Sequence, residues 1–331
     1  MKRLARRLVS FGSAAGALGG LYAGASALAA RALADRLLSP RGLGPVPDRY
    51  AELAEGLAAS AIGGVVAEFH HPGSVRLPVE LSATFASPGE PAARPTILFL
   101  HGKGGNASEW TPEAVRALKL GYNVLIPDLR GHGRSGGAFF TLGYLEKDDL
   151  GEALEAVHER FGVDAGRLGI HSCSAGSSVA LEFAADRAGI RAIWLESPFA
   201  RPREMARHYL SRITRVPGPL LSLASRWAVQ RAIATVAREL GVHDTRGGLS
   251  LLDPVQAAAR VTAPILLVHG EDDGLVPPRF HARLAAALPP RSAVWNVAGA
   301  GHCHHADEPA AVSRQAYARR WEEFFRTYLP S

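Results

Sequence analysis

A serine and a histidine far apart in the chain could together form an activated nucleophile. Ser174 lies in the run IHSCSAGSS, directly after a predicted strand and at the start of a helical pattern. His302 lies in VAGAGHCHHADEP, where glycines allow a loop to bring the imidazole over that serine. A serine hydroxyl attacks poorly until a base removes its proton, and the base needs a buried carboxylate to orient it. We therefore predict Ser174 as nucleophile and His302 as general base, with His304 and His305 as rim residues.

The residues around Ser174 match most of a nucleophile elbow. In the motif G-x-S-x-G the serine sits on a sharp strand-to-helix turn, and small residues two positions away let the chain pass close by. Gly176 fills one of these positions, whereas Ser172 stands where the other glycine is usual. Because serines often act only as helix caps, the motif needs support from the rest of the sequence.

A second glycine-containing loop could supply hydrogen-bond donors for the reaction. The run LFLHGKGGNASEW places His101 and Gly102 at the end of an earlier predicted strand. The backbone N–H groups of Lys103 and Ala175 are the expected oxyanion donors, and each such donor is worth about 3 kcal/mol in the transition state. Taken alone, the same run also fits an ordinary loop between a strand and a helix.

Short apolar runs alternate with longer amphipathic stretches from about Val65 onward. This rhythm is typical of strands that are connected by helices into a mostly parallel α/β sheet. An opening antiparallel pair is expected from VVAEFHH and LPVELSATF. Six compact strands are expected after it, at 96–100, 123–127, 167–171, 192–196, 264–270 and 293–297.

The stretch from Phe199 to Leu252 is too long for a single connection between strands. It carries a helical stripe of apolar residues, Val229, Ile233, Val236 and Leu240, so we interpret it as an inserted helical cap. Several arginines accompany the apolar residues. The cap could therefore be a lid that admits acyl chains at a membrane surface, or it could simply pack onto its domain.

Two further segments identify a family that the chain resembles. The runs GYNVLIPDLRGHGRSGG (121–137) and LLVHGEDDGLVP (266–277) resemble the α/β-hydrolases, in particular the serine aminopeptidase-like branch. With the serine and oxyanion segments, the resemblance covers roughly 75–329. It implies an α/β-hydrolase fold, with a mostly parallel eight-stranded sheet flanked by helices and a helical cap inserted after strand 6.

The resemblance also assigns the acid. The family pattern places the triad carboxylate three residues after the strand-ending glycine and shortly before Val-Pro, which selects Asp273. Asp272 and Glu196 are the rival carboxylates. The resulting order along the chain, Ser, Asp, His, is that of α/β-hydrolases.

The only two cysteines flank the predicted catalytic residues. Cys173 precedes Ser174, and Cys303 follows His302. If the serine and histidine are within hydrogen-bonding reach, their neighbours come to separations at which a disulfide is geometrically possible. The arrangement resembles the Cys-Ser, Asp, His-Cys pattern of tannases and some feruloyl esterases, which implies a bridge. Two buried free thiols are the alternative.

The N-terminal region differs from the rest of the chain. After the basic MKRLARR, no charged residue occurs from Leu8 to Ala30, which predicts a signal peptide or membrane anchor over 1–30. A buried helix rich in alanine and glycine is the alternative. Residues 31–64 are predicted to form a tether followed by a short helix, and residues 65–331 are predicted to form the catalytic domain. The catalytic domain is accordingly expected outside the cytoplasm, in contact with a membrane through its N-terminal segment or secreted.

Composition and charge exclude several other classes. The chain has 331 residues, 47% hydrophobic and 21% charged, as in globular proteins. Its net charge of +6 comes partly from the N-terminal arginines and lysine, and no basic stripe with interleaved aromatics indicates nucleic-acid binding. The HCHH run could suggest a metal, but no other Cys or His pair stands at ligand spacing. No metal or cofactor is expected.

These observations predict a serine hydrolase, similar to carboxylesterases and lipases, that cleaves a small-molecule, lipid or other acyl ester of a carboxylic acid through an acyl-enzyme. Peptidase, amidase or acyltransferase activity would use the same residues. A non-catalytic binding protein is a further alternative, although such proteins usually lose a triad member. The sequence does not determine the oligomeric state.

Overall fold

Eight strands form one sheet in the order β1-β2-β4-β3-β5-β6-β7-β8. The computed structural model describes residues 2–40, 47–241, 253–303 and 314–331. β2 runs antiparallel to both of its neighbours, and all other neighbouring strands are parallel, which confirms the predicted fold class. The strands are β1 (Val65–His71), β2 (Leu81–Ser87), β3 (Thr96–Leu100), β4 (Asn123–Pro127), β5 (Leu168–Cys173), β6 (Ile190–Glu196), β7 (Ile265–Gly270) and β8 (Ala293–Val297).

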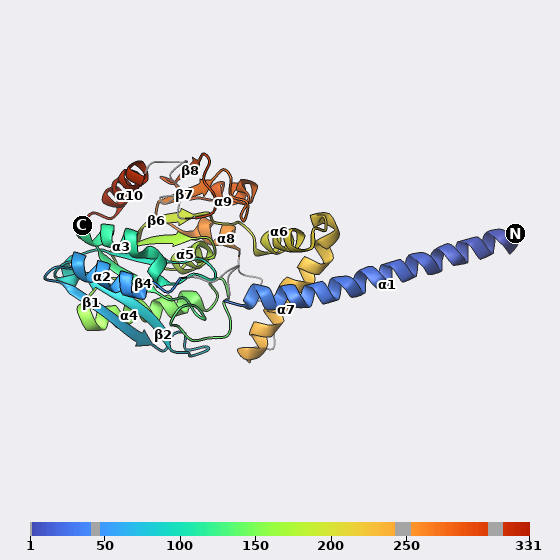
Figure 1. Ribbon diagram of the computed structural model, residues 1–331, viewed down its shortest axis with the longest axis horizontal. Coiled ribbons are helices and arrows are strands. Elements are labelled where there is room, and N and C mark those ends of the chain that lie inside the picture. The colour runs from blue at the N-terminus through green and yellow to red at the C-terminus, as the bar shows by residue number, and fades with distance from the viewer. Residues whose placement is uncertain (1, 41–46, 242–252, 304–313) are drawn as a thin grey trace.

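Helices cover both faces of this sheet (Figure 1). One face packs against α4 (Glu146–Phe161), α5 (Ala175–Ala185), α8 (Pro254–Arg260) and the short α9 (Ala282–Ala285). The other face packs against α2 (Tyr50–Ser60), α3 (Thr111–Lys119) and α10 (Arg314–Tyr328). The central strands are therefore buried on both sides, which explains their uninterrupted apolar sequences.

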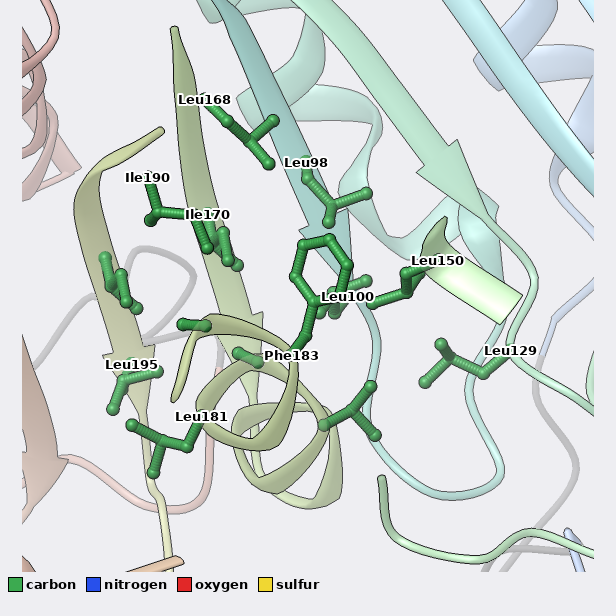
Figure 2. Close-up of a cluster of buried hydrophobic side chains, with 14 of the residues drawn as sticks. Leu98, Leu100, Leu129, Leu150, Leu168, Ile170, Leu181, Phe183, Ile190 and Leu195 are labelled. Atoms are coloured by element: carbon green, nitrogen blue, oxygen red, sulfur yellow. The ribbon is translucent and has the colours of Figure 1, made fainter. Parts of the chain in front are cut away.

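Strand β3 shows how these apolar runs divide between the two faces. Leu98 and Leu100 point into the cluster that Figure 2 shows, together with Leu168 and Ile170 of β5. Phe99, between the two leucines, packs into the cluster on the opposite face. Because successive side chains of a strand point to opposite faces, the strand fixes both layers of helices at once.

Two helices occupy the place predicted for the cap, between β6 and α8. They are α6 (Pro202–Thr214) and α7 (Ser222–Glu239), and the last residues of the predicted cap, 242–252, lie outside the described residues. The buried face of α7 differs from the predicted stripe. Val236 is buried as expected, but Val229, Ile233 and Leu240 are only half-buried. Small residues form the buried face instead, namely Ala224, Ala228 and Ala232.

The reason for the alanine face is the N-terminal helix, α1 (Lys2–Leu38), whose C-terminal part packs against α7 (Figure 1). Ala30 and Ala34 of α1 meet the alanines of α7, so the two helices can approach closely. The helix continues through 31–38, which the sequence suggested as the start of a tether, and the predicted short helix is α2.

The N-terminal part of α1 extends away from the rest of the protein (Figure 1). Helix α1 as a whole includes residues 2–30 of the segment 1–30 that the sequence suggests as a signal peptide or anchor. Within the described part of the chain, no helix combines the length and the apolar character needed to cross a membrane.

Candidate active site

Ser174 lies on a sharp turn between β5 and α5. Its φ of 52° is in a region that non-glycine residues rarely adopt, at a cost on the order of 1–3 kcal/mol. Gly176 permits this turn, because a Cβ there would lie 2.4 Å from the carbonyl oxygen of His101 and 2.6 Å from that of Leu100. Residues held in such strained conformations often belong to active sites.

Ser172 stands where a glycine is usual, and the structure shows how it is accommodated. Its side chain is fully buried. Its hydroxyl lies 3.2 Å from Oγ of Ser177 and 3.4 Å from the carbonyl oxygen of Trp194. A buried hydroxyl is tolerated when it forms hydrogen bonds, so a serine satisfies the position that the motif assigns to a small residue.

His302 joins Ser174 to Asp273. Its Nε2 lies 3.0 Å from Oγ of Ser174, and its Nδ1 lies 2.7 Å from Oδ2 of Asp273. The neighbours assign the tautomer: Nδ1–H donates to the carboxylate and Nε2 accepts from the serine hydroxyl. The three residues that the sequence predicts for catalysis thus form one hydrogen-bonded series.

The carboxyl group of Asp273 is buried and held on both oxygens. Oδ1 accepts hydrogen bonds from the backbone N–H groups of Leu275 at 2.9 Å and Val276 at 2.7 Å. Burial opposes ionisation of Asp273, but the hydrogen bond and charge of His302, the N–H of Val276 and the charge of His269 together outweigh it and lower the pKa of Asp273 below the ordinary value. The carboxylate is therefore ionised and fixed in orientation beside His302.

The two rival carboxylates have other surroundings. Asp272 is exposed to solvent. Glu196 is buried, and its carboxylate accepts hydrogen bonds from the hydroxyl of Tyr317 and, at 3.3 Å, from Nε1 of Trp194. It also lies 3.1 Å from Nε2 of His171. Asp273 is thus the carboxylate that the structure places on His302.

The predicted oxyanion loop lies directly against Ser174. A Cβ on Gly102 would lie 3.3 Å from Cβ of the serine, so the backbone passes very close to it. His101 fixes this loop, because its Nδ1 lies 2.8 Å from the carbonyl oxygen of Gly102 and its Nε2 accepts from the N–H of Leu129 at 3.0 Å. Burial lowers the pKa of His101 to about 4, so the imidazole is neutral and can donate and accept as these bonds require.

The expected oxyanion donors follow the ends of two neighbouring parallel strands, β3 and β5. Lys103 comes next after Gly102 in the loop that begins at the end of β3. Ala175 is the first residue of α5, so its N–H has no acceptor within the helix. Both residues thus follow the carboxyl ends of adjacent parallel strands, which is where donors for an oxyanion beside Ser174 are expected.

Cys173 and Cys303 form a disulfide whose Cα atoms are 5.9 Å apart. Both residues are buried. The N–H of Cys303 also donates to Oγ of Ser197 at 3.1 Å. The loop that carries His302 is therefore fixed to the elbow covalently and to the end of β6 by a hydrogen bond.

Among the residues that the structure describes, no group of three His, Cys, Asp or Glu side chains is placed to hold a metal ion. The sulfur of Cys303 is committed to the disulfide. His304 and His305, predicted as rim residues, lie outside the described residues.

Removing the disulfide is expected to destabilise the protein strongly. The bridge closes a loop with a sequence separation of 130, for which the chain-entropy model gives about 4–5 kcal/mol of unfolding free energy. Cys173→Ala, Cys303→Ala and the double variant should lose similar amounts, since each lacks the same bond. Chemical denaturation of the three variants and of reduced wild type measures this. A double variant as stable as the oxidised protein would contradict the prediction.

Some residues around the site carry no recognisable signal in the sequence. His269 is fully buried, and its Nε2 lies 2.7 Å from the carbonyl oxygen of Val276 and 3.5 Å from Oδ2 of Asp273. Arg212 and His208 of α6 both contact the carbonyl oxygen of Gly274, beside the acid. These contacts join segments far apart in the chain, so only the folded structure reveals that the cap touches the acid loop.

The chain is similar to known hydrolases and to relatives without a described activity. It matches the alpha/beta hydrolase family over residues 97–315. The uncharacterized protein YqkD of Bacillus subtilis is 31% identical over 57% of this chain and 58% of its own length, so the match spans little more than half of that relative.

Solved structures share the fold at low identity. An esterase of Pyrococcus furiosus superposes with a TM-score of 0.63, at 20% identity, over 88% of this chain and 98% of the esterase. An acylaminoacyl peptidase of Pyrococcus horikoshii superposes with a TM-score of 0.57, at 17% identity, over 81% of this chain and 42% of the peptidase.

The match to the family spans more than half of the sequence and includes Ser174, Asp273 and His302, and the sheet has the corresponding topology. The chain belongs to the alpha/beta hydrolase family.

Proposed function

We propose that this hydrolase cleaves carboxylic esters through an acyl-enzyme formed on Ser174. The observation that carries the proposal is the hydrogen-bonded series from Ser174 through His302 to Asp273. A neutral imidazole next to the hydroxyl can take its proton, and the ionised carboxylate stabilises the imidazolium that results.

The reaction would proceed in two half-reactions. Oγ of Ser174 attacks the ester carbonyl carbon while its proton passes to Nε2 of His302, and the N–H groups of Lys103 and Ala175 bind the oxyanion. The tetrahedral intermediate then collapses, and His302 gives the proton to the departing alkoxide, which leaves as an alcohol. Water repeats the sequence on the acyl-enzyme, releases the carboxylic acid and restores the serine.

A fluorophosphonate probe tests the nucleophile directly. The folded protein should become covalently labelled, and peptide mapping should place the adduct on Ser174, since the probe reacts with serines that a neighbouring base activates. Folded protein that remains unlabelled would favour a binding protein that has kept the fold.

A substrate panel then tests the proposed ester preference. p-Nitrophenyl esters of graded acyl length should be hydrolysed faster than aminoacyl p-nitroanilides. Faster hydrolysis of the anilides would replace the proposal with a peptidase that uses the same residues, and products that form only when a second alcohol is added would indicate acyl transfer.

A further inference from the structure

The C-terminal end of α1 lies against the oxyanion loop. The ammonium group of Lys103 donates to the carbonyl oxygen of Arg36 and, at 3.0 Å, to that of Leu37. The next carbonyl along, that of Leu38, accepts from the N–H of Phe140 at 2.8 Å. The last carbonyls of a helix lack intrahelical donors and carry partial negative charge, so a lysine is a favourable partner for them.

The same helix end is also held by the cap. Nε of Arg36 donates to the hydroxyl of Tyr209 in α6 at 3.2 Å. Leu33 is buried and belongs to an apolar cluster that α1 shares with both cap helices; its other buried members are Ala30, Ala34, Ala206, Leu210, Leu221, Ala224, Ala228 and Ala232. We call this contact the α1 seat. It fixes the carbonyls to which Lys103 binds.

The backbone and the side chain of Lys103 therefore contact different parts of the protein. Its backbone N–H is the expected oxyanion donor, next to Gly102, which lies against Ser174. Its side chain is bound to the end of α1. Burial, reinforced by the nearby charge of Arg36, lowers the pKa of the Lys103 ammonium group to about 8, which still leaves most of it protonated at neutral pH.

We propose that Lys103 is a positioning residue through which the α1 seat sets the geometry of the oxyanion hole. Helix α1 then contributes to catalysis, and the rate of ester hydrolysis depends on the packing of α1 against the cap. This inference rests on the proposed esterase function. Its basis is that a small displacement of a transition-state donor costs far more in rate than in substrate binding.

Substitutions at Lys103 test the first half of the proposal. Lys103→Met removes the ammonium group and keeps an unbranched side chain that is only one heavy atom shorter. We expect kcat for a p-nitrophenyl ester to fall about tenfold with KM changed less than about twofold, because a displaced oxyanion donor weakens transition-state binding. Lys103→Arg keeps a cation and should restore most of kcat. Lys119→Met, which removes an exposed lysine on α3, is the control and should have no effect.

Substitutions in α1 test the second half. Leu33→Glu places a charge in the α1 seat and should reproduce the loss of kcat, whereas Leu28→Glu, at a site 75% exposed on the same helix, should not. The double variant Lys103→Met/Leu33→Glu should be no slower than the slower single variant, because both changes break one connection. Thermal melting checks that each variant is folded, and Leu33→Ala is the milder replacement if Leu33→Glu is not.

The outcomes separate this inference from the proposed function. If wild type turns over esters and both Lys103→Met and the variants at Leu33 keep wild-type kcat, the positioning role is wrong and the esterase proposal stands. If wild type neither turns over esters nor reacts with fluorophosphonate, the esterase proposal fails. In that case, amide hydrogen exchange of residues 102–105 tests whether the α1 seat holds the oxyanion loop. The proposal predicts faster exchange in Leu33→Glu than in Leu28→Glu, and equal exchange in the two variants overturns it.

Discussion

Ser174→Ala is expected to lower kcat for ester hydrolysis on the order of 10⁶-fold, the largest effect of any single substitution in this protein. The variant keeps the oxyanion donors and the substrate contacts but has no atom to form the acyl-enzyme. The strained turn and Gly176 remain, so the fold should be preserved. Initial rates with a short p-nitrophenyl ester, measured at saturation, give kcat for both proteins.

Two comparisons make this result specific. Ser178→Ala removes another hydroxyl of α5, one that is buried and has no hydrogen-bond partner among the described residues, and it should leave kcat unchanged. His302→Ala should be nearly as slow as Ser174→Ala, and the double variant no slower, because the residues act as a unit. A Ser174→Ala protein within about tenfold of wild type would exclude the acyl-enzyme.

The sheet could be predicted from the sequence because its strands are buried on both faces. A run such as TILFL, flanked by turn residues, is too short for a typical buried helix and too apolar for a surface loop, and it forms β3 as predicted.

The nucleophile elbow was harder to predict, since Ser172 breaks the motif. Its acceptability depends on Ser177 and Trp194, and the second of these lies on the neighbouring strand. Local pattern contains no information about that contact.

The contact between the cap and α1 could not be predicted from the sequence. The predicted stripe on α7 favoured large apolar residues such as Val229 and Ile233, but the partner of this face is another helix rich in alanine. Close packing between two helices selects small residues, and the sequence of either helix alone does not reveal its partner. The same limitation applies to Lys103, whose side-chain acceptors are backbone carbonyls 66 and 67 residues away along the chain.

Asp273 illustrates the opposite case, in which the family pattern selects a residue and the structure explains how it would work. Its Oδ1 is occupied by the N–H groups of Leu275 and Val276, so only Oδ2 faces His302. The two backbone donors act as a selective clamp. Because these N–H groups can only donate, they require an oxygen with lone pairs at the Oδ1 position, whatever group occupies the Oδ2 position.

Asp273→Asn is therefore expected to lower kcat on the order of 10⁴-fold while KM stays similar. The clamp forces the amide oxygen of the asparagine into the Oδ1 position, and its NH₂ group then faces Nδ1 of His302. That NH₂ can only donate, so Nδ1 must accept and the imidazole proton moves to Nε2. An Nε2–H imidazole cannot take the proton of Ser174, and no negative charge remains to stabilise an imidazolium.

The neighbouring residue provides the matched control for this prediction. Asp272→Asn makes the same chemical change one position earlier, on an exposed side chain, and should leave kcat within about twofold of wild type. Because Asp273→Asn keeps the shape of the side chain and both backbone hydrogen bonds, it should still melt cooperatively. A folded Asp273→Asn enzyme with kcat near wild type would mean that His302 does not depend on this carboxylate, and the acid would have to be sought elsewhere. A loss of the expected size in Asp273→Asn, with Asp272→Asn unaffected, would assign the orienting role to the one carboxylate that the clamp holds.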